Sequence, residues 1–107
     1  MHDLTARQLA HGRFWKKYLR LTRAGVTMLR ALEIIQAEEA SPDFREIIIH
    51  LHDRASDGFQ LSEAMEDHAD VFSLSARELI RTAERQGHWD LVIEELAGGL
   101  LEGTFDG

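Results

Sequence analysis

The sequence has no cysteine, a single proline and no long apolar run. The first and the last of these features each exclude a class of protein. Without cysteine the chain forms neither a disulfide framework nor a thiolate metal site, which fits a reducing compartment. No window approaches the roughly 20 consecutive apolar residues that a membrane-spanning helix needs. Basic residues such as Arg7, Arg13, Lys16 and Lys17 also interrupt the N-terminal segment, so it lacks the apolar core of a signal peptide. We therefore expect one soluble domain, large enough at 107 residues to bury a core without covalent staples.

The net charge of −7 is divided unevenly along the chain. Residues 1–30 carry seven basic side chains and one acid, a net +6, whereas residues 31–107 carry five arginines and eighteen acids, a net −13. Such asymmetry indicates either a charged partner surface or a solvated helix face with a chance bias. Nucleic acid is disfavoured as the partner, because most of the surface would repel phosphate.

The apolar residues recur at helical spacing almost throughout, and no segment alternates like a strand. Gly25, Gly58 and Gly87 each follow an amphipathic run, where a left-handed cap favours glycine, so they are predicted to form turns between helices. Helices are expected over about 4–24, from Thr27, from Ser41-Pro42 to Gly58, over 61–68, from Ser73 or Ser75 to Gly87, and over 89–101. Residues 98–107 are expected to form a frayed tail. Six helices with short connections predict an all-α, antiparallel six-helix bundle within a single domain, 1–107.

Local signals support several of these helix starts. Thr27 and Ser41 can each accept a backbone N–H at a helix N-terminus, and Pro42 loses no hydrogen bond at a first helical position. Ser75 with Glu78 three residues on fits a capping box. The apolar stripes predict the core, whose members are Phe14, Trp15, Tyr18, Leu19, Leu21, Met28, Ala31, Leu32, Ile35, Phe44, Ile47, Ile48, Leu51, Ala55, Leu61, Ala64, Met65, Ala76, Leu79, Ile80, Ala83, Trp89, Val92, Ile93, Leu96 and Leu100.

Six histidines invite a metal or catalytic interpretation that their spacing does not support. His50 and His52 point about 200° apart on a helix and cannot hold one ion together. Glu46 and His50 share a helix face, but this pair leaves a first-row metal short of ligands. Near predicted helix ends or surfaces, without a partner cluster, lie His11, His68 and His88.

The acidic groups at 38–39, 63–70 and 94–95 lack the alternating ligand spacing of a calcium loop, and a solvated helix face is their default interpretation. The sequence also contains no P-loop, no nucleophile turn and no dinucleotide fingerprint. We therefore expect no catalytic residue, no metal site, no cofactor and no enzymatic activity.

A row of basic side chains follows one face of the first expected helix. Lys16, Arg20 and Arg23 follow i, i+4, i+7 spacing opposite the expected aromatic core, and Arg13 and Lys17 extend the row. We name these five residues the basic ridge and predict that they bind a partner. The ridge can meet anionic lipid headgroups, an acidic partner protein or the acidic helices of the chain itself.

Six short phrases occur in order along residues 14–97. They are Phe14-Trp15 through Tyr18, Ala24-Gly25-Val26, Leu29-Arg30-Ala31-Leu32, Gly58-Phe59-Gln60-Leu61-Ser62-Glu63-Ala64-Met65, Asp70-Val71-Phe72 and Ala83-Glu84-Arg85-Gln86-Gly87-His88-Trp89. Each phrase is weak by itself, but their order and spacing resemble the type II secretion F family, which includes the platform proteins of type IV pilus machines. Two positions depart from that family, with Ala83 in place of a glycine and Trp89 in place of a leucine.

The resemblance implies a non-enzymatic scaffold in the inner-membrane platform of a type II secretion or type IV pilus machine, on its cytoplasmic face. Its implied partners are the assembly ATPase, other platform proteins and a second copy in a homodimer, with the membrane reached only through regions absent from this chain. The alternative is a free-standing soluble adaptor or regulatory bundle, because no membrane helix follows residue 97.

Glu84 is the polar residue that stands out among the matched positions. It lies in the last turn of an expected helix, where a negative charge opposes the helix dipole. A carboxylate in such a place should have a compensating contact. We expect it to cap the N-terminus of a neighbouring helix, or else to contact a partner or a cation.

Overall fold

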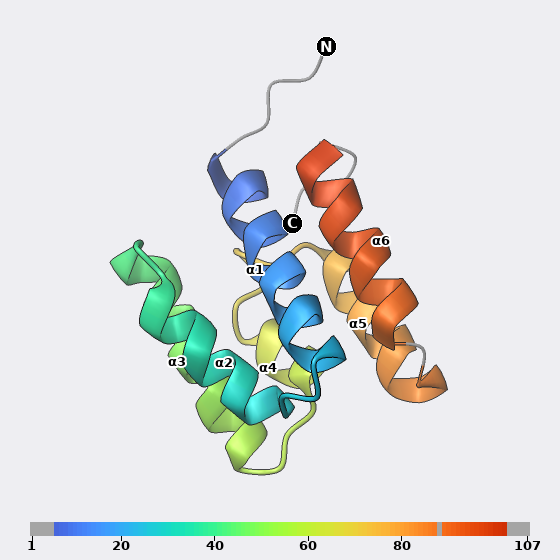
Figure 1. The fold of residues 1–107 in the computed structure, drawn as a ribbon, viewed down its shortest axis with the longest axis horizontal. Helices are drawn as coiled ribbons and strands as arrows, with labels where there is room; N and C mark the ends of the chain where they lie inside the picture. The colour runs from blue at the N-terminus through green and yellow to red at the C-terminus, as the bar shows by residue number, and fades with distance from the viewer. Residues whose placement is uncertain (1–5, 88, 103–107) are drawn as a thin grey trace.

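The computed structural model describes residues 6–87 and 89–102, which form six helices and no strand (Figure 1). The helices are α1 (Ala6–Arg23), α2 (Met28–Glu38), α3 (Pro42–Ser56), α4 (Leu61–Glu66), α5 (Leu74–Gln86) and α6 (Trp89–Glu102). The predicted all-α, antiparallel six-helix bundle is confirmed. Outside the described part of the chain lie Leu4, His88, the side chain of Leu100 and residues 103–107.

The helices pack in a closed cycle. Each contacts the next one along the chain, and α6 returns to pack against α1 in the most extensive helix contact of the fold. In Figure 1, α1 lies between the α2–α3 hairpin and the α5–α6 hairpin, and α4 links α3 to α5. This arrangement makes α1 the central helix, with one face in the core and the other turned outward between the two hairpins.

The core is built around the aromatic side chains of α1. Trp15 is fully buried, and its ring meets those of Phe14, Tyr18 and Phe72 at centroid distances of 4.7, 5.8 and 6.5 Å. Tilted and edge-to-face contacts of this kind suit the quadrupoles of the rings. The predicted core residues are buried or half-buried wherever their side chains are described.

His11 lies in the core rather than near a helix end or surface, so that prediction is wrong. Only 2% of the residue is exposed, and its ring packs between those of Phe44 and Phe72 at 5.0 and 5.3 Å. Position 11 shares a helix stripe with Trp15 and Tyr18 at i, i+4, i+7 spacing, which turns it inward.

Side-chain caps define three helix starts. The hydroxyls of Thr27 and Ser41 each accept the backbone N–H three residues on, both at 3.3 Å, which confirms the predicted caps. Ser73 does the same for α5 at 3.2 Å. The helix therefore starts at the first of the two predicted positions, and the capping box predicted at Ser75 is wrong, because Ser75 already lies inside α5.

Two helix ends differ from expectation. α4 stops at Glu66 instead of continuing to 68, because the chain turns there to bring Phe72 into the core. α6 runs through Gly98 and Gly99 to Glu102, one residue beyond the helix predicted over 89–101, so the fraying predicted at Gly98-Gly99 is wrong. Packing of α6 along α1 outweighs the low helix propensity of these glycines, as tertiary contact commonly does.

Candidate functional site

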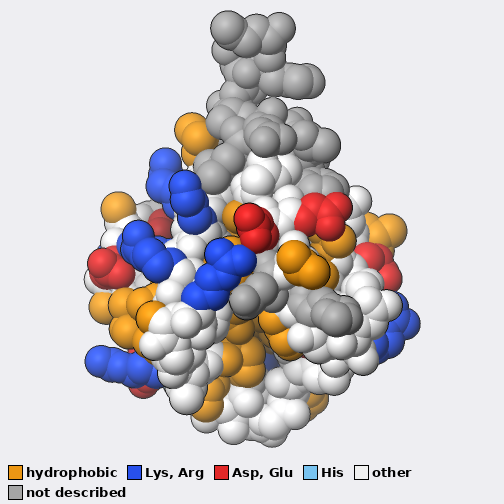
Figure 2. All heavy atoms as spheres, turned by 45° about the vertical axis from the view of Figure 1, so that its right-hand side comes forward, with side chains coloured by type: hydrophobic (Ala, Val, Ile, Leu, Met, Phe, Trp, Pro, Cys, Tyr) orange, Lys and Arg blue, Asp and Glu red, His pale blue; other side chains and the backbone are white. Residues whose placement is uncertain are grey.

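The basic ridge lies on the face of α1 that turns away from the core. Arg13, Lys16, Arg20 and Arg23 are exposed, and Lys17 is half-buried. Their spacing of three or four residues places them on one side of the helix, opposite the aromatic rings. Lys and Arg side chains gather on one side of the molecule, beside acidic and apolar side chains (Figure 2). The structure therefore keeps the predicted residues together on one helix face.

The acidic helices of the chain neutralise part of this ridge. Lys17 lies 3.4 Å from Glu38 of α2, and Arg23 lies 2.9 Å from Glu94 of α6. The ion pairs formed among the described residues include none of the other three ridge members, which are Arg13, Lys16 and Arg20. Contacts within the chain thus account for two ridge charges and leave three facing solvent.

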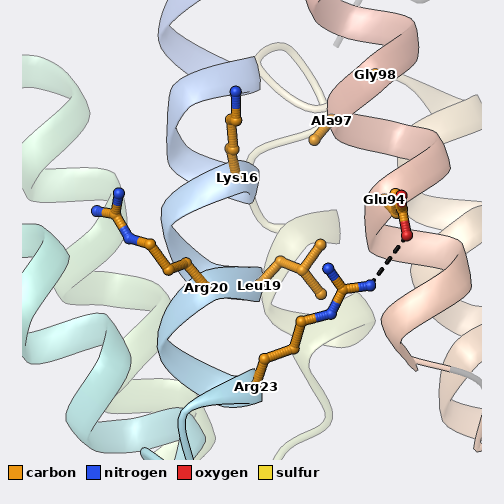
Figure 3. A pocket seen from close by; sticks show the side chains of 7 residues that line it. All are labelled: Lys16, Leu19, Arg20, Arg23, Glu94, Ala97 and Gly98. Carbon is orange, nitrogen blue, oxygen red and sulfur yellow. Dashed lines mark hydrogen bonds and ion pairs between the residues drawn. The ribbon is translucent and has the colours of Figure 1, made fainter.

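Two hollows flank the middle of the ridge, one on each side of α1. The first, of about 430 Å³, lies between α1 and α6 and is lined by Lys16, Leu19, Arg20, Arg23, Glu94, Ala97 and Gly98 (Figure 3). The second, of about 400 Å³, lies between α1 and the C-terminal end of α2. Lys16 and Arg20 line both hollows, so these two cations lie between two concave surfaces.

Glu84 caps a neighbouring helix, as its unfavourable position predicted. One carboxylate oxygen accepts the backbone N–H of Ser62 at 3.0 Å, and the other accepts the hydroxyl of the same serine. Ser62 is the second residue of α4 and is 1% exposed, so these bonds satisfy a buried N-terminus. Ser62 was not identified from the sequence, since a serine inside a helical phrase carries no signal of a partner 22 positions away.

The same carboxylate influences α1. The pKa of Tyr18 is raised to about 12, first by burial of the phenol and second by the negative charge of Glu84. Glu84 of α5 therefore lies close to both α4 and α1. It belongs to the internal framework of the fold, and its predicted contact with a partner remains a prediction.

Gly25, Gly58 and Gly87 all have positive φ, at 91°, 95° and 76°. After α1, the N–H of Gly25 donates to Thr22 and that of Val26 to Leu21, at 3.1 and 3.0 Å. This pair of bonds is the Schellman pattern, in which a left-handed residue ends a helix and satisfies its last carbonyls. The turn at Gly25 sets the direction in which the chain leaves α1 and enters α2.

Two histidines that are 18 positions apart in the sequence contact each other between α3 and the turn after α4. Nδ1 of His50 on α3 lies 2.7 Å from Nε2 of His68, in the turn after α4, so one ring donates a hydrogen bond to the other. The pKa of His68 is lowered, first by burial and second by the charge of His50, against the opposing charges of Asp67 and Asp70. Sequence reasoning missed the pair because 18 residues separate its members.

Each acidic cluster contributes at least one carboxylate to an ion pair. Beyond the ridge contacts, Asp67 pairs with Arg54 at 3.1 Å, and Glu66 pairs with Arg81. The described residues contain no group of three or more metal-ligating side chains placed to hold an ion, around Glu46 and His50 or elsewhere. Among the described helices, none combines the length and the apolar character that a bilayer crossing requires.

Residues 14–102 match the family described as Type II secretion system (T2SS), protein F. The chain belongs to the type II secretion system protein F family. The match begins at residue 14, as the resemblance of the six phrases does, and runs beyond residue 97 to residue 102. It covers all six helices except the first turns of α1.

Two curated relatives carry names consistent with this family. The chain is 32% identical over 87 residues to the type IV pilus assembly protein PilC of Thermus thermophilus, covering 81% of this chain and 21% of that protein. It is 26% identical over 77 residues to the type II secretion system protein F of Vibrio cholerae, covering 72% of this chain and 19% of that protein. The chain thus spans about a fifth of the length of these protein F family relatives.

Proposed function

We propose that this chain is a non-enzymatic docking domain of a type II secretion or type IV pilus platform, acting at the cytoplasmic face of the inner membrane. In this role it links the assembly ATPase to other machine components through protein–protein contacts, and a second copy of the platform protein is among the proposed partners. Membership of the protein F family supports the machine, and the names of the two relatives support its class.

One observation supports docking through α1 in particular. Arg13, Lys16 and Arg20 are exposed, lie on one face and have no ion-pair partner among the described residues. Their charges contribute nothing visible to internal pairing, although eighteen of the chain's nineteen acids lie in residues 31–107. A cationic strip left uncompensated on an acidic protein is suited to steer and hold an acidic partner.

The test is capture of the assembly ATPase and platform proteins from the same cell by the tagged chain, with purified components for each positive result. Lys16→Glu together with Arg20→Glu should abolish capture without changing the thermal midpoint. Arg30→Glu with Arg85→Glu is the matched control, because both positions are exposed, lie off the ridge and change the net charge by the same amount. Retained capture by the folded ridge variant would remove α1 from the docking role. Absence of capture by the unmodified, folded chain would favour the free-standing adaptor.

A further inference from the structure

The hollow between α1 and α6 has the form of a groove with an apolar floor and a charged rim. Leu19, Ala97 and Gly98 form the floor. On the α1 side, Lys16 extends along the helix, and Arg20 lines the hollow although its guanidinium points away from α6 (Figure 3). A Cβ added at Gly98 would meet nothing within 4 Å, so the groove is open at this point.

The apolar surface continues along α6. Leu91, Glu94 and Gly98 follow i, i+3, i+7 spacing and therefore share one face of the helix. Leu91 is 69% exposed, an unusual state for a large aliphatic side chain on a helix whose other leucine with a described side chain, Leu96, is fully buried. The face of α6 that lines the groove thus also carries an exposed leucine, Leu91, one turn before Glu94.

We propose that this groove binds an acidic amphipathic helix of a partner protein, an inference that rests on the docking function proposed above. Lys16 and Arg20 lie one helical turn apart, about 6 Å along α1, which matches carboxylates at i and i+4 of a second helix. Arg23 is already held by Glu94, and no acid among the described residues pairs with the other two cations, which leaves them to meet the carboxylates of a partner. Apolar side chains of the partner helix pack on Leu19, Ala97 and Leu91, as in helix-in-groove recognition.

The placement of apolar side chains favours a protein partner over a membrane surface. Helices that bind bilayers combine basic residues with large apolar side chains that insert among the lipids. Among the described residues, the large hydrophobic side chains that are exposed are Phe59, Leu74 and Leu91, and none of them lies on α1. The ridge therefore presents cations above a recessed floor, a shape that fits a helix better than a flat array of headgroups.

The experiment titrates the isotope-labelled chain with a synthetic helical peptide of about 18 residues, five turns, carrying leucines at i, i+4 and i+7 flanked by glutamates. A second peptide replaces every glutamate with lysine. Gly98→Leu fills the groove without altering charge, and Gly98→Ala is its matched control. Lys16→Glu with Arg20→Glu removes the rim charges, and thermal melts establish that each variant is folded.

We expect the acidic peptide to shift the amide resonances of 16–20 and 94–98. Its affinity should fall by about tenfold or more in Gly98→Leu and in the rim variant, and stay within about threefold in Gly98→Ala. The lysine peptide should not bind. Absence of these shifts at about 1 mM acidic peptide, or equal binding of both peptides, would overturn the proposal.

Two further outcomes separate the groove from the docking function. Tighter binding to anionic phospholipid vesicles than to the acidic peptide, unaffected by Gly98→Leu, would assign the ridge to a membrane and overturn the helix proposal. Capture of the assembly ATPase that is lost in the rim variant but kept in Gly98→Leu would leave docking in place and reject the groove. Capture kept in the rim variant would reject docking through α1 itself.

Discussion

Gly58 follows the last turn of α3 with a φ of 95°. Its N–H donates to Ala55, and the N–H of Phe59 donates to Arg54, both at 3.1 Å, which completes the same Schellman pattern as after α1. The guanidinium of Arg54 also stacks on the ring of Phe59, 3.7 Å from its centroid. Single residues of this kind decide where a helix ends and in which direction the chain leaves it.

Gly58→Val should destabilise the fold by about 1–3 kcal/mol, because a β-branched side chain is strained at this backbone conformation. The measurement is the thermal midpoint by circular dichroism, with Gly58→Asn as control, since asparagine tolerates the left-handed region better. A midpoint for Gly58→Val equal to that of the unmodified chain would show that the left-handed turn is not required.

Glu84 and Tyr18 form a second residue-scale test, because Tyr18 is the sole tyrosine and its ionisation can be followed by absorbance. Its pKa is raised to about 12, so the neutral phenol is favoured in the folded state. Stability should therefore be lost as pH rises from the ordinary phenol pKa of 10 toward 12. Glu84→Gln should lower the pKa of Tyr18 but leave it above 10, because burial is the larger cause. An unchanged titration in Glu84→Gln would place the carboxylate too far away to act.

At the element scale, side-chain contacts join neighbouring elements through residues that lie far apart in the sequence. Glu84 of α5 caps α4, and the His50–His68 pair holds α3 to the turn after α4. The ion pair between Arg54 and Asp67 spans the same two elements. Short α4 thus owes its position to contacts from both neighbours, as expected for a helix too short to be stable alone.

The histidine pair predicts a pH dependence. The pKa of His68 is lowered in the folded state, so the unfolded chain binds its proton more readily. Its contribution to stability is full above about pH 6.5 and is lost as pH falls below that value. Unfolding by urea at pH 7.5 and 5.5 should show a smaller pH effect in His68→Gln than in the unmodified chain. His52→Gln is the control, because it removes a histidine outside the pair; an equal loss of pH dependence there would refute the assignment.

Gly98 gives the opposite glycine prediction to Gly58. It lies inside α6 without positive φ, and an added Cβ would meet nothing within 4 Å. Gly98→Ala should therefore stabilise the fold by about 0.5–1 kcal/mol, by raising helix propensity and reducing the freedom of the unfolded chain. Chemical denaturation measures this gain. A loss of stability would indicate that close packing at this position, rather than open space, selects glycine.

At the scale of the whole molecule, the closed cycle makes every helix depend on its two neighbours. α6 contacts α1 and α5, and the α1–α6 contact is the one that closes the cycle. No described helix lies outside this cycle, so we expect the described helices to unfold together as one cooperative unit. The basic ridge follows from the same arrangement, because α1 is covered on both sides and offers only its outer face.

Leu96→Ala tests this cooperativity, since Leu96 is fully buried in α6. The substitution should cost about 2–5 kcal/mol through lost burial and the cavity left behind. Tryptophan fluorescence and circular dichroism should still report one coincident transition, because Trp15 and Leu96 belong to the same buried core. Two separate transitions would show that α6 unfolds alone and that the cycle is not a cooperative unit.

The charge pattern of the whole chain also acquires a structural explanation. The net +6 of residues 1–30 lies mainly on α1, and among the described residues the acids of α2 and α6 pair with two of the five ridge members. The other three are left to face solvent beside two hollows. The sequence shows the asymmetry of charge, but only the packing of α2 and α6 beside α1 shows which charges form ion pairs within the chain.

Several features were predictable because they depend on near neighbours in the chain. The caps at Thr27 and Ser41, the apolar stripes and the positive φ of Gly25, Gly58 and Gly87 are decided within a few residues. The misses share a different cause. The inward position of His11, the absence of a capping box at Ser75 and the ordered state of Gly98-Gly99 depend on what packs against each segment.

The sequence by itself determined six amphipathic helices, their turns and the basic face of α1, since helix propensity, capping and charge spacing are local properties. The tertiary structure alone decided which side chains meet across elements. Glu84 accepts hydrogen bonds from Ser62, and His50 forms a hydrogen bond with His68. The ridge borders a groove with Leu19 and Gly98 at its floor. The physical reason is that burial and long-range contact depend on how helices close around a common core, which no short window of sequence specifies.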